Sequence, residues 1–142
     1  MIYVKDIMTR KVRTIGSDAS IKEAAKAMVR WEIGALVIMA GSKPVGIITE
    51  GDISRSVARG HDPDATVGSL KKKSLITVSP AEKVEVAARI MSEAGIKKLP
   101  VMENHKLVGI VTQTDIVGSS FSLVTSLKEM VQARYRPPDF EM

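Results

Sequence analysis

The chain of 142 residues contains no cysteine, which excludes disulfide bonds, thiolate nucleophiles and zinc–thiolate sites and fits the reducing cytoplasm, where we expect the protein. Aromatic residues make up only 4% of the sequence, so a platform for stacking single-stranded nucleic acid is poorly supplied. No apolar run approaches the ~20 residues of a membrane span, and no signal peptide is visible. We therefore expect no membrane association.

The remaining composition is that of a soluble globular protein, with 44% hydrophobic and 26% charged residues. The net charge of +5 favours anionic partners but does not choose among nucleotides, nucleic acid and acidic proteins. A surface for nucleic acid would draw on the basic residues Arg10, Lys11, Arg13, Lys71, Lys72, Lys73, Arg134 and Arg136.

The sequence repeats at a constant offset of 63 residues without a gap. Residues 4–53 and 67–116 are identical at 15 of 50 positions, where composition alone would give roughly 3. Thr49-Glu50-Gly51-Asp52 returns as Thr112-Gln113-Thr114-Asp115. A duplication therefore underlies the architecture, and a ligand-site motif in one half occurs again in the other.

Each half is predicted to be an α/β (α+β) unit of the order β-α-β-β-α. Helical spacing of apolar residues begins at Ile21 and again at Val84, and Ser20 with Glu23 is the pattern of a capping box. Runs rich in β-branched residues predict a hairpin over 35–39 and 45–49, with turn residues 41–44, and another over 99–102 and 107–112. Short strands are expected over 12–15 and 75–78, and further helices over 53–59 and from 116.

These units divide the chain into a first repeat over 1–60, a linker over 61–66, a second repeat over 67–122, and a C-terminal amphipathic helix with a tail over 123–142. The linker is polar and contains Pro63, and Pro137-Pro138 ends the helical period of the tail. Each half alone is near the lower size limit for a self-sufficient core. We therefore expect the halves to fold against each other.

Thr49 with Asp52, and Thr112 with Asp115, lie where a predicted strand passes into a helix. A carboxylate that accepts two hydrogen bonds from a vicinal diol is a natural ribose clamp, and a neighbouring hydroxyl adds a polar contact. The N–H groups at the start of the following helix suit a phosphate. The same residues also form a plain helix cap, and one side chain can serve both purposes.

Two such units, each introduced by a lead-in segment (residues 4–9, degenerate at 67–72) and each closing on Gly-Ile-(Ile/Val)-Thr-x-x-Asp, resemble the CBS-domain pair, named after cystathionine β-synthase. The resemblance covers roughly residues 4–120 and implies a stand-alone, pseudo-twofold module. It implies a non-catalytic sensor without a cofactor, which binds AMP, ADP or ATP, with S-adenosylmethionine or NAD as other ligands. It also implies a homodimer formed through helices and an unidentified regulated protein as a further partner.

In the family, each cleft joins the Thr and Asp of one repeat to the first hairpin strand of the other. The nucleotide-binding residues implied for the first cleft are Thr49, Asp52, Ile96, Lys97, Lys98 and Pro100. Those implied for the second cleft are Thr112, Thr114, Asp115, Ile33, Gly34 and Ala35. Loop residues such as Lys11 and Val12 would line the adenine. Because only the first cleft gains two ammonium groups, we expect it to prefer ligands with more phosphate charge.

Two other functions stay open at this point. A nucleic-acid-binding protein would use the basic residues given above, and its binding would weaken with salt. An enzyme acting on a nucleotide would need a nucleophile–base pair, a metal cluster or a P-loop, and the sequence offers none of these. His61 and His105 lie in predicted loops without a nearby carboxylate or second histidine in sequence, so no metal site is expected.

Overall fold

The computed structural model describes residues 1–70 and 74–119, so the basic run 71–73 and the predicted tail helix over 123–142 lie outside the described residues. No helix in the described ranges is long and apolar enough to cross a membrane. The elements follow in the order α1 (Val4–Ile7), β1 (Thr14–Gly16), α2 (Ile21–Trp31), β2 (Ala35–Ala40), β3 (Lys43–Thr49), α3 (Glu50–Ala58), a 3-10 turn (Val67–Leu70), α4 (Val84–Ala94), β4 (Lys98–Glu103), β5 (Lys106–Thr112) and α5 (Gln113–Gly118).

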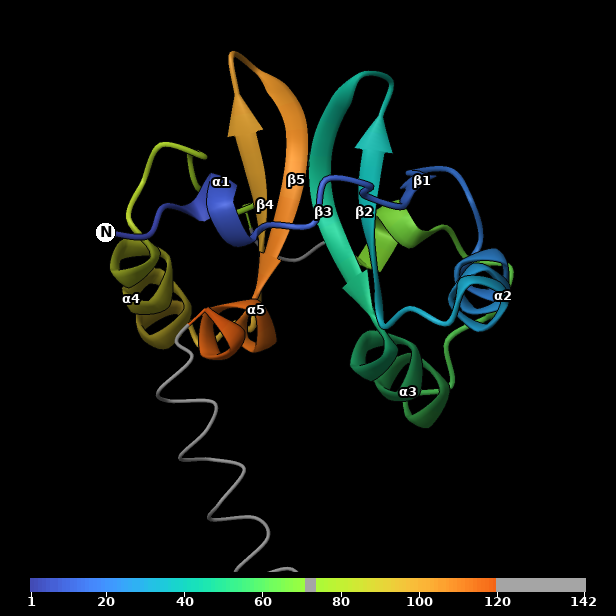
Figure 1. Ribbon diagram of the computed structural model, residues 1–142. Coiled ribbons are helices and arrows are strands. Elements are labelled where there is room, and N and C mark those ends of the chain that lie inside the picture. Colours follow the sequence, from blue (N-terminus) through green and yellow to red (C-terminus); the bar gives the residue numbers. More distant parts are fainter. Residues whose placement is uncertain (71–73, 120–142) are drawn as a thin grey trace, which may run out of the picture.

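The predicted α/β class and the two hairpins are confirmed. In each half, one strand pairs antiparallel with the next across a two-residue turn, β2 with β3 and β4 with β5, and both pairs shift register at the same repeat position. Each hairpin and its flanking helices form one side of the molecule in Figure 1, with α2 and α3 on one side and α4 and α5 on the other. The predicted turn over 41–44 is shorter than expected, because Lys43 and Pro44 already belong to β3.

The predicted first strand differs between the two halves. In the first half it lies at Thr14–Gly16 rather than 12–15 and runs parallel to β2, and the ladder continues with Ser17 N–H donating to the Met39 carbonyl at 2.8 Å. The second half keeps only a single bridge, between Val78 and Val101. Pro80 stands at the position of Ser17 and has no N–H, so the equivalent hydrogen bond cannot form and the strand stops.

The long helices bury the apolar faces that their spacing predicts. The buried side chains are Ile21, Ala24 and Met28 on α2, and Val84, Ala87 and Met91 on α4. Ser20 caps α2 by accepting a hydrogen bond from Glu23 N–H at 3.0 Å, as expected. The helix predicted over 53–59 begins earlier, at Glu50, because Thr49 is its N-cap.

The N-terminal lead-in packs on the opposite half of the chain. Val4 N–H donates to the Glu82 carbonyl at 2.9 Å, and Thr9 pairs with Ile110 of β5. The Val4 side chain is fully buried in the second half's core, with residues of α4, β4 and β5. Figure 1 shows α1 beside the second hairpin, before the chain crosses to β1 on the other side.

The second lead-in packs in the reverse direction. Val67 N–H donates to the Ala19 carbonyl at 2.8 Å, and Ile21 N–H donates to the Ala65 carbonyl at 2.9 Å. Val67 is fully buried in the first half's core, with Ala24, Met28 and strands β2 and β3. Residues 63–67 thus belong to the packing of the first half, although the sequence places them in a linker and at the start of the second repeat.

Candidate functional site

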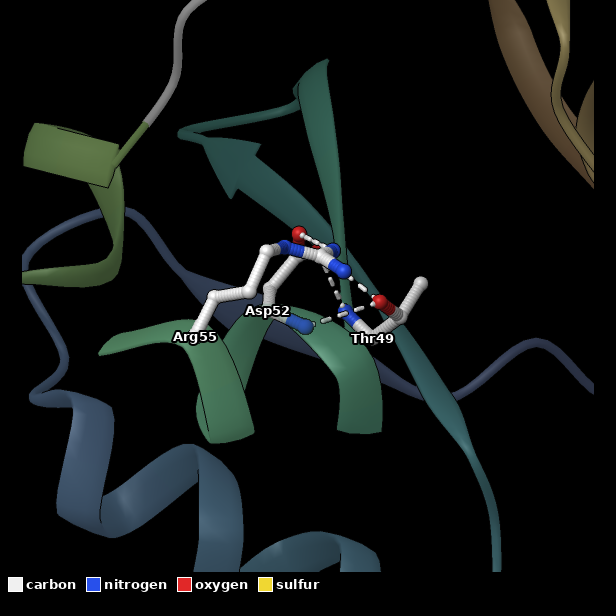
Figure 2. A network of polar contacts seen from close by, with 3 residues as sticks. All are labelled: Thr49, Asp52 and Arg55. Atoms are coloured by element: carbon white, nitrogen blue, oxygen red, sulfur yellow. Dashed lines mark hydrogen bonds and ion pairs between the residues drawn. The ribbon is translucent and has the colours of Figure 1, made fainter. Parts of the chain in front are cut away.

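Thr49 and Asp52 form a closed hydrogen-bonded cap at the start of α3, drawn in Figure 2. Asp52 Oδ2 accepts from Thr49 N–H at 2.8 Å and from the Thr49 hydroxyl at 3.0 Å, while Asp52 N–H donates to Thr49 Oγ1 at 3.2 Å. The second carboxylate oxygen, Oδ1, accepts from Arg55 Nη2 at 2.7 Å. This arrangement fixes the carboxylate in the first turn of α3, just after the end of β3, with both of its oxygens accepting hydrogen bonds.

The second copy has the same two backbone hydrogen bonds, but among the described residues it lacks the arginine and the bond from the threonine hydroxyl to the carboxylate. Asp115 Oδ2 accepts from Thr112 N–H at 2.9 Å, and Asp115 N–H donates to Thr112 Oγ1 at 3.1 Å. Gly118 occupies the position equivalent to Arg55, and within residues 1–70 and 74–119 Asp115 Oδ1 has no protein donor. The two carboxylates therefore have the same backbone setting and different capacities for an incoming donor.

The start of the first hairpin strand lies beside the Thr–Asp cap of its own repeat. Ala35 pairs with Thr49, and Lys98 pairs with Thr112. The helix starts are tied to the same segments, because Glu50 N–H donates to the Gly34 carbonyl at 3.1 Å and Gln113 N–H donates to the Lys97 carbonyl at 2.8 Å. The backbone thus brings Gly34 and Ala35 to the first cap, and Lys97 and Lys98 to the second.

The Lys98 side chain extends from the second repeat to the first. A Cβ atom built on Gly34 would lie 3.3 Å from Lys98 Nζ and 3.0 Å from Glu50 Oε1. The ammonium group thus lies close to the residue that follows Thr49, which is the cross-repeat approach implied for the first cleft. Glu50 adds a negative charge at the same place, so the charge of Lys98 is partly offset there.

The other implied residues differ in how accessible they are. Ile33 and Ile96 are partly buried and pack against the cores of their own repeats. Pro100 is fully buried in β4 and presents no side-chain surface to a ligand. Lys97, Thr114 and Lys11 are exposed, and Val12 is half-buried.

Two charged residues near the first cap were missed at the sequence level. Arg55 follows Asp52 by three positions, a spacing at which opposite charges meet on a helix, so it was detectable. Glu50 gave no comparable signal, because its proximity to Gly34 depends on how the hairpin packs. In the part of the chain that the structure describes, no group of three or more histidine, aspartate or glutamate side chains is placed to hold a metal ion.

Comparison with known proteins identifies the family. The CBS domain model matches the chain twice, at residues 4–59 and 67–122. The protein belongs to the CBS domain family. Both matches begin at a lead-in segment and extend beyond a Thr–Asp cap, so each CBS domain contains a segment that packs on the other domain.

Three similar proteins extend this assignment to a CBS pair. CBS domain-containing protein YhcV of Bacillus subtilis (strain 168) is 32% identical over 123 residues, covering 86% of this chain and 88% of YhcV. The CBS domain pair of protein MJ0100, in complex with 5′-methylthioadenosine and S-adenosyl-L-methionine, is 34% identical with a TM-score of 0.76, covering 90% of this chain and 98% of that one. CBS domain protein PAE2072 from Pyrobaculum aerophilum, complexed with AMP, is 26% identical with a TM-score of 0.77, covering 90% and 99%.

Proposed function

We propose that this CBS pair is a regulatory module of the cytoplasm that binds an adenosine ligand at two sites, one at each Thr–Asp cap. AMP, ADP and ATP are the first candidates, with S-adenosylmethionine or NAD next. The proposal assigns no reaction to the module. Its output is a change in the affinity or activity of a partner protein, driven by the differential binding of the ligand to two states.

One observation carries the proposal: the same half-exposed carboxylate is held in the same cap at the same place in both repeats. A ribose diol needs two adjacent acceptor positions, and a carboxylate, with about four acceptor positions, is the side chain that can offer them beside its cap hydrogen bonds. The AMP complex of PAE2072 and the S-adenosylmethionine complex of the MJ0100 pair support the choice of adenosine ligands. Lys98, whose ammonium group reaches Gly34 in the first repeat, is the cation that we assign to phosphates at the first site.

The nucleic-acid alternative receives less support from the described residues. Arg13, one of its basic residues, has its guanidinium over the Trp31 ring, 4.5 Å from the centroid. Its densest basic run, 71–73, and its C-terminal arginines lie outside the described residues. The AMP and S-adenosylmethionine complexes of similar CBS proteins favour the adenosine-ligand site, which we retain as the proposed function.

The test replaces both carboxylates with alanine. Losing hydrogen bonds to a charged acceptor should weaken AMP binding by roughly ten- to hundredfold per site, which isothermal titration calorimetry measures directly. Glu23→Ala, which removes an exposed carboxylate from the first turn of α2, is the matched control and should leave affinity unchanged. Unchanged affinity in Asp52→Ala/Asp115→Ala, with a cooperative melt retained, would reduce both residues to helix caps.

We further infer that the homodimer forms through the outer face of α2 and α3. Val29 on α2 and Val57 on α3 are 79% and 73% exposed, which is a high exposure for large apolar side chains on neighbouring helices. Between the helices lies a hollow of about 340 Å³, lined by Ala25, Met28, Val29, Glu32, Ile33, Glu50, Ile53 and Ser54. An apolar face with a depression of this kind suits a second copy of itself.

Sedimentation of the full chain tests this interface. Wild type should sediment as a dimer at micromolar concentration, and Val29→Ser with Val57→Ser should shift it toward monomer. Ile76→Ser removes an apolar side chain that is 41% exposed elsewhere on the chain and serves as the control. A dimer that persists in the double variant would exclude this face.

A further inference from the structure

The two proposed sites differ in how many hydrogen bonds their carboxylates can still accept. A carboxylate offers about four acceptor positions. Asp52 uses three of them, for Thr49 N–H, the Thr49 hydroxyl and Arg55 Nη2. Asp115 uses one among the described residues, for Thr112 N–H. A vicinal diol donates two hydrogen bonds, so Asp115 can accept both at once, whereas Asp52 has about one position left and has to release a partner. Arg55 is the exposed partner, and it alone occupies the outer oxygen Oδ1.

The Arg55 guanidinium lies close to Gly51, one turn earlier on α3. A Cβ atom at Gly51 would lie 3.2 Å from Arg55 Nη1 and 3.3 Å from Nη2, so the guanidinium lies folded back over the first turn of α3, where a side chain at position 51 would require it to move by a few tenths of an ångström. The second repeat changes both residues together, with Thr114 at the position of Gly51 and Gly118 at that of Arg55. The pair Gly51–Arg55 is thus one unit that the other repeat lacks.

We propose that Arg55 is a specificity-determining residue of the first site: it opposes neutral adenosine ligands and favours those that carry phosphate. This inference rests on the proposed function. Released from Asp52 by the ribose, the guanidinium lies next to the helix start, where a phosphate would sit and would give it a new partner. A ligand without phosphate breaks the Arg55–Asp52 ion pair and provides no new anionic partner for the guanidinium.

The second site has the opposite preference and accepts adenosine ligands without phosphate. Among the described residues, Asp115 accepts the diol without displacing a cation, and neither Gly118 nor Thr114 brings a positive charge. The backbone of Lys98 lies beside this cap, but its ammonium group extends toward Gly34 of the first repeat. This site therefore tolerates adenosine ligands whose 5′ substituent is neutral, and the two sites of one chain can report on two chemically different ligands.

The experiment compares AMP with 5′-methylthioadenosine by isothermal titration calorimetry in the full chain carrying Asp115→Ala, which leaves the first site. Adding Arg55→Gln should narrow the preference for AMP by about two- to fivefold, the range that an exposed ion pair is worth. Arg59→Gln removes the same charge one turn further along α3 and should leave the preference unchanged. Equal effects of the two substitutions would overturn the role of Arg55.

The reciprocal transfer tests the same unit in the other repeat. In an Asp52→Ala background, Thr114→Gly with Gly118→Arg should raise the preference for AMP by a similar factor, and no atom of the described residues would lie within 4 Å of a Cβ at Gly118. An unchanged preference there would limit Arg55 to a local ion pair and overturn the inference. If Asp115→Ala binds neither ligand while Asp52→Ala binds both, the first cap is no ligand site and the inference fails while the second site stands. If wild type binds neither, the proposed function itself fails.

Discussion

The cores of the two repeats contain the same kinds of residues, yet each is completed from a different direction along the chain. The first core takes Val67, which follows it in sequence, and the second takes Val4, which lies far ahead of it. Both valines are fully buried. The structural unit and the sequence repeat therefore have different boundaries. The residues of the first core come from one continuous segment of the chain, whereas the second core also needs Val4 from the N-terminus.

Crossed lead-ins also explain why the two CBS domains stay together. Separating the halves at residue 62 would remove Val67 from one core and Val4 from the other, together with the backbone hydrogen bonds that surround them. Exposing the sheet faces is then a second cost rather than the only one. The link between the halves therefore includes the two lead-in segments, each of which packs on the other half.

The largest expected effect comes from changing where the chain is cut. Fragments 1–62 and 63–142 should both be poorly folded, because each carries a lead-in that packs on the missing half and lacks the one that it needs. Fragment 10–70 has almost the same length as 1–62 but contains β1, α2, the first hairpin, α3 and Val67. We expect it to be the more structured of the two, with circular dichroism and thermal melts as the measurement.

The two fragments of matched length control for size and for the exposed sheet face, which both possess. Equal helicity and equal melting in 1–62 and 10–70 would mean that the crossed lead-in adds nothing. Cooperative melting of 1–62 or 63–142 near the temperature of the full chain would contradict the dependence of the halves on each other.

A smaller effect should follow from truncating each lead-in valine. Val4→Ala and Val67→Ala each remove two methyl groups from a fully buried site and should cost on the order of 2 kcal/mol of unfolding free energy. Hydrogen exchange should show where that cost falls: Val4→Ala should raise exchange in α4, β4 and β5, and Val67→Ala in α2, β2 and β3. The reverse pattern, or an even rise across both halves, would show that the cores do not respond separately.

Much of this architecture could be predicted from local signals. The constant offset gave the duplication, the apolar spacing on both sides of Ala24 gave α2, and Thr49 gave the cap at which α3 begins. The exchange of lead-ins between the halves could not be predicted in this way, because the local sequence around Val4 is compatible with burial in either core. Pro80 could have predicted that the second repeat lacks β1. The approach of Lys98 to Gly34 and Glu50, in contrast, depends on packing between the repeats, which no local sequence pattern encodes.

The smallest effect concerns the residue that ends each long helix. Both α2 and α4 close on a left-handed residue, Gly95 at φ 65° in the second repeat and Glu32 at φ 51° in the first. Glycine adopts this conformation without steric cost, whereas a residue with a Cβ in it lowers the free energy of unfolding by roughly 1 kcal/mol. Among the described residues no atom lies within 4 Å of a Cβ built on Gly95, so Gly95→Ala should destabilise by about that amount through backbone strain alone.

Glu32→Gly should act in the opposite sense, with a gain of about 0.5 kcal/mol after the extra freedom of glycine in the unfolded chain is subtracted. Glu32→Ala is the control, because it removes the carboxylate and keeps the Cβ. Denaturant melts should therefore rank Glu32→Gly above Glu32→Ala. If both variants are equally stable, strain at this position is negligible, and the first repeat accepts a glutamate beside Ile33 and Gly34 without cost.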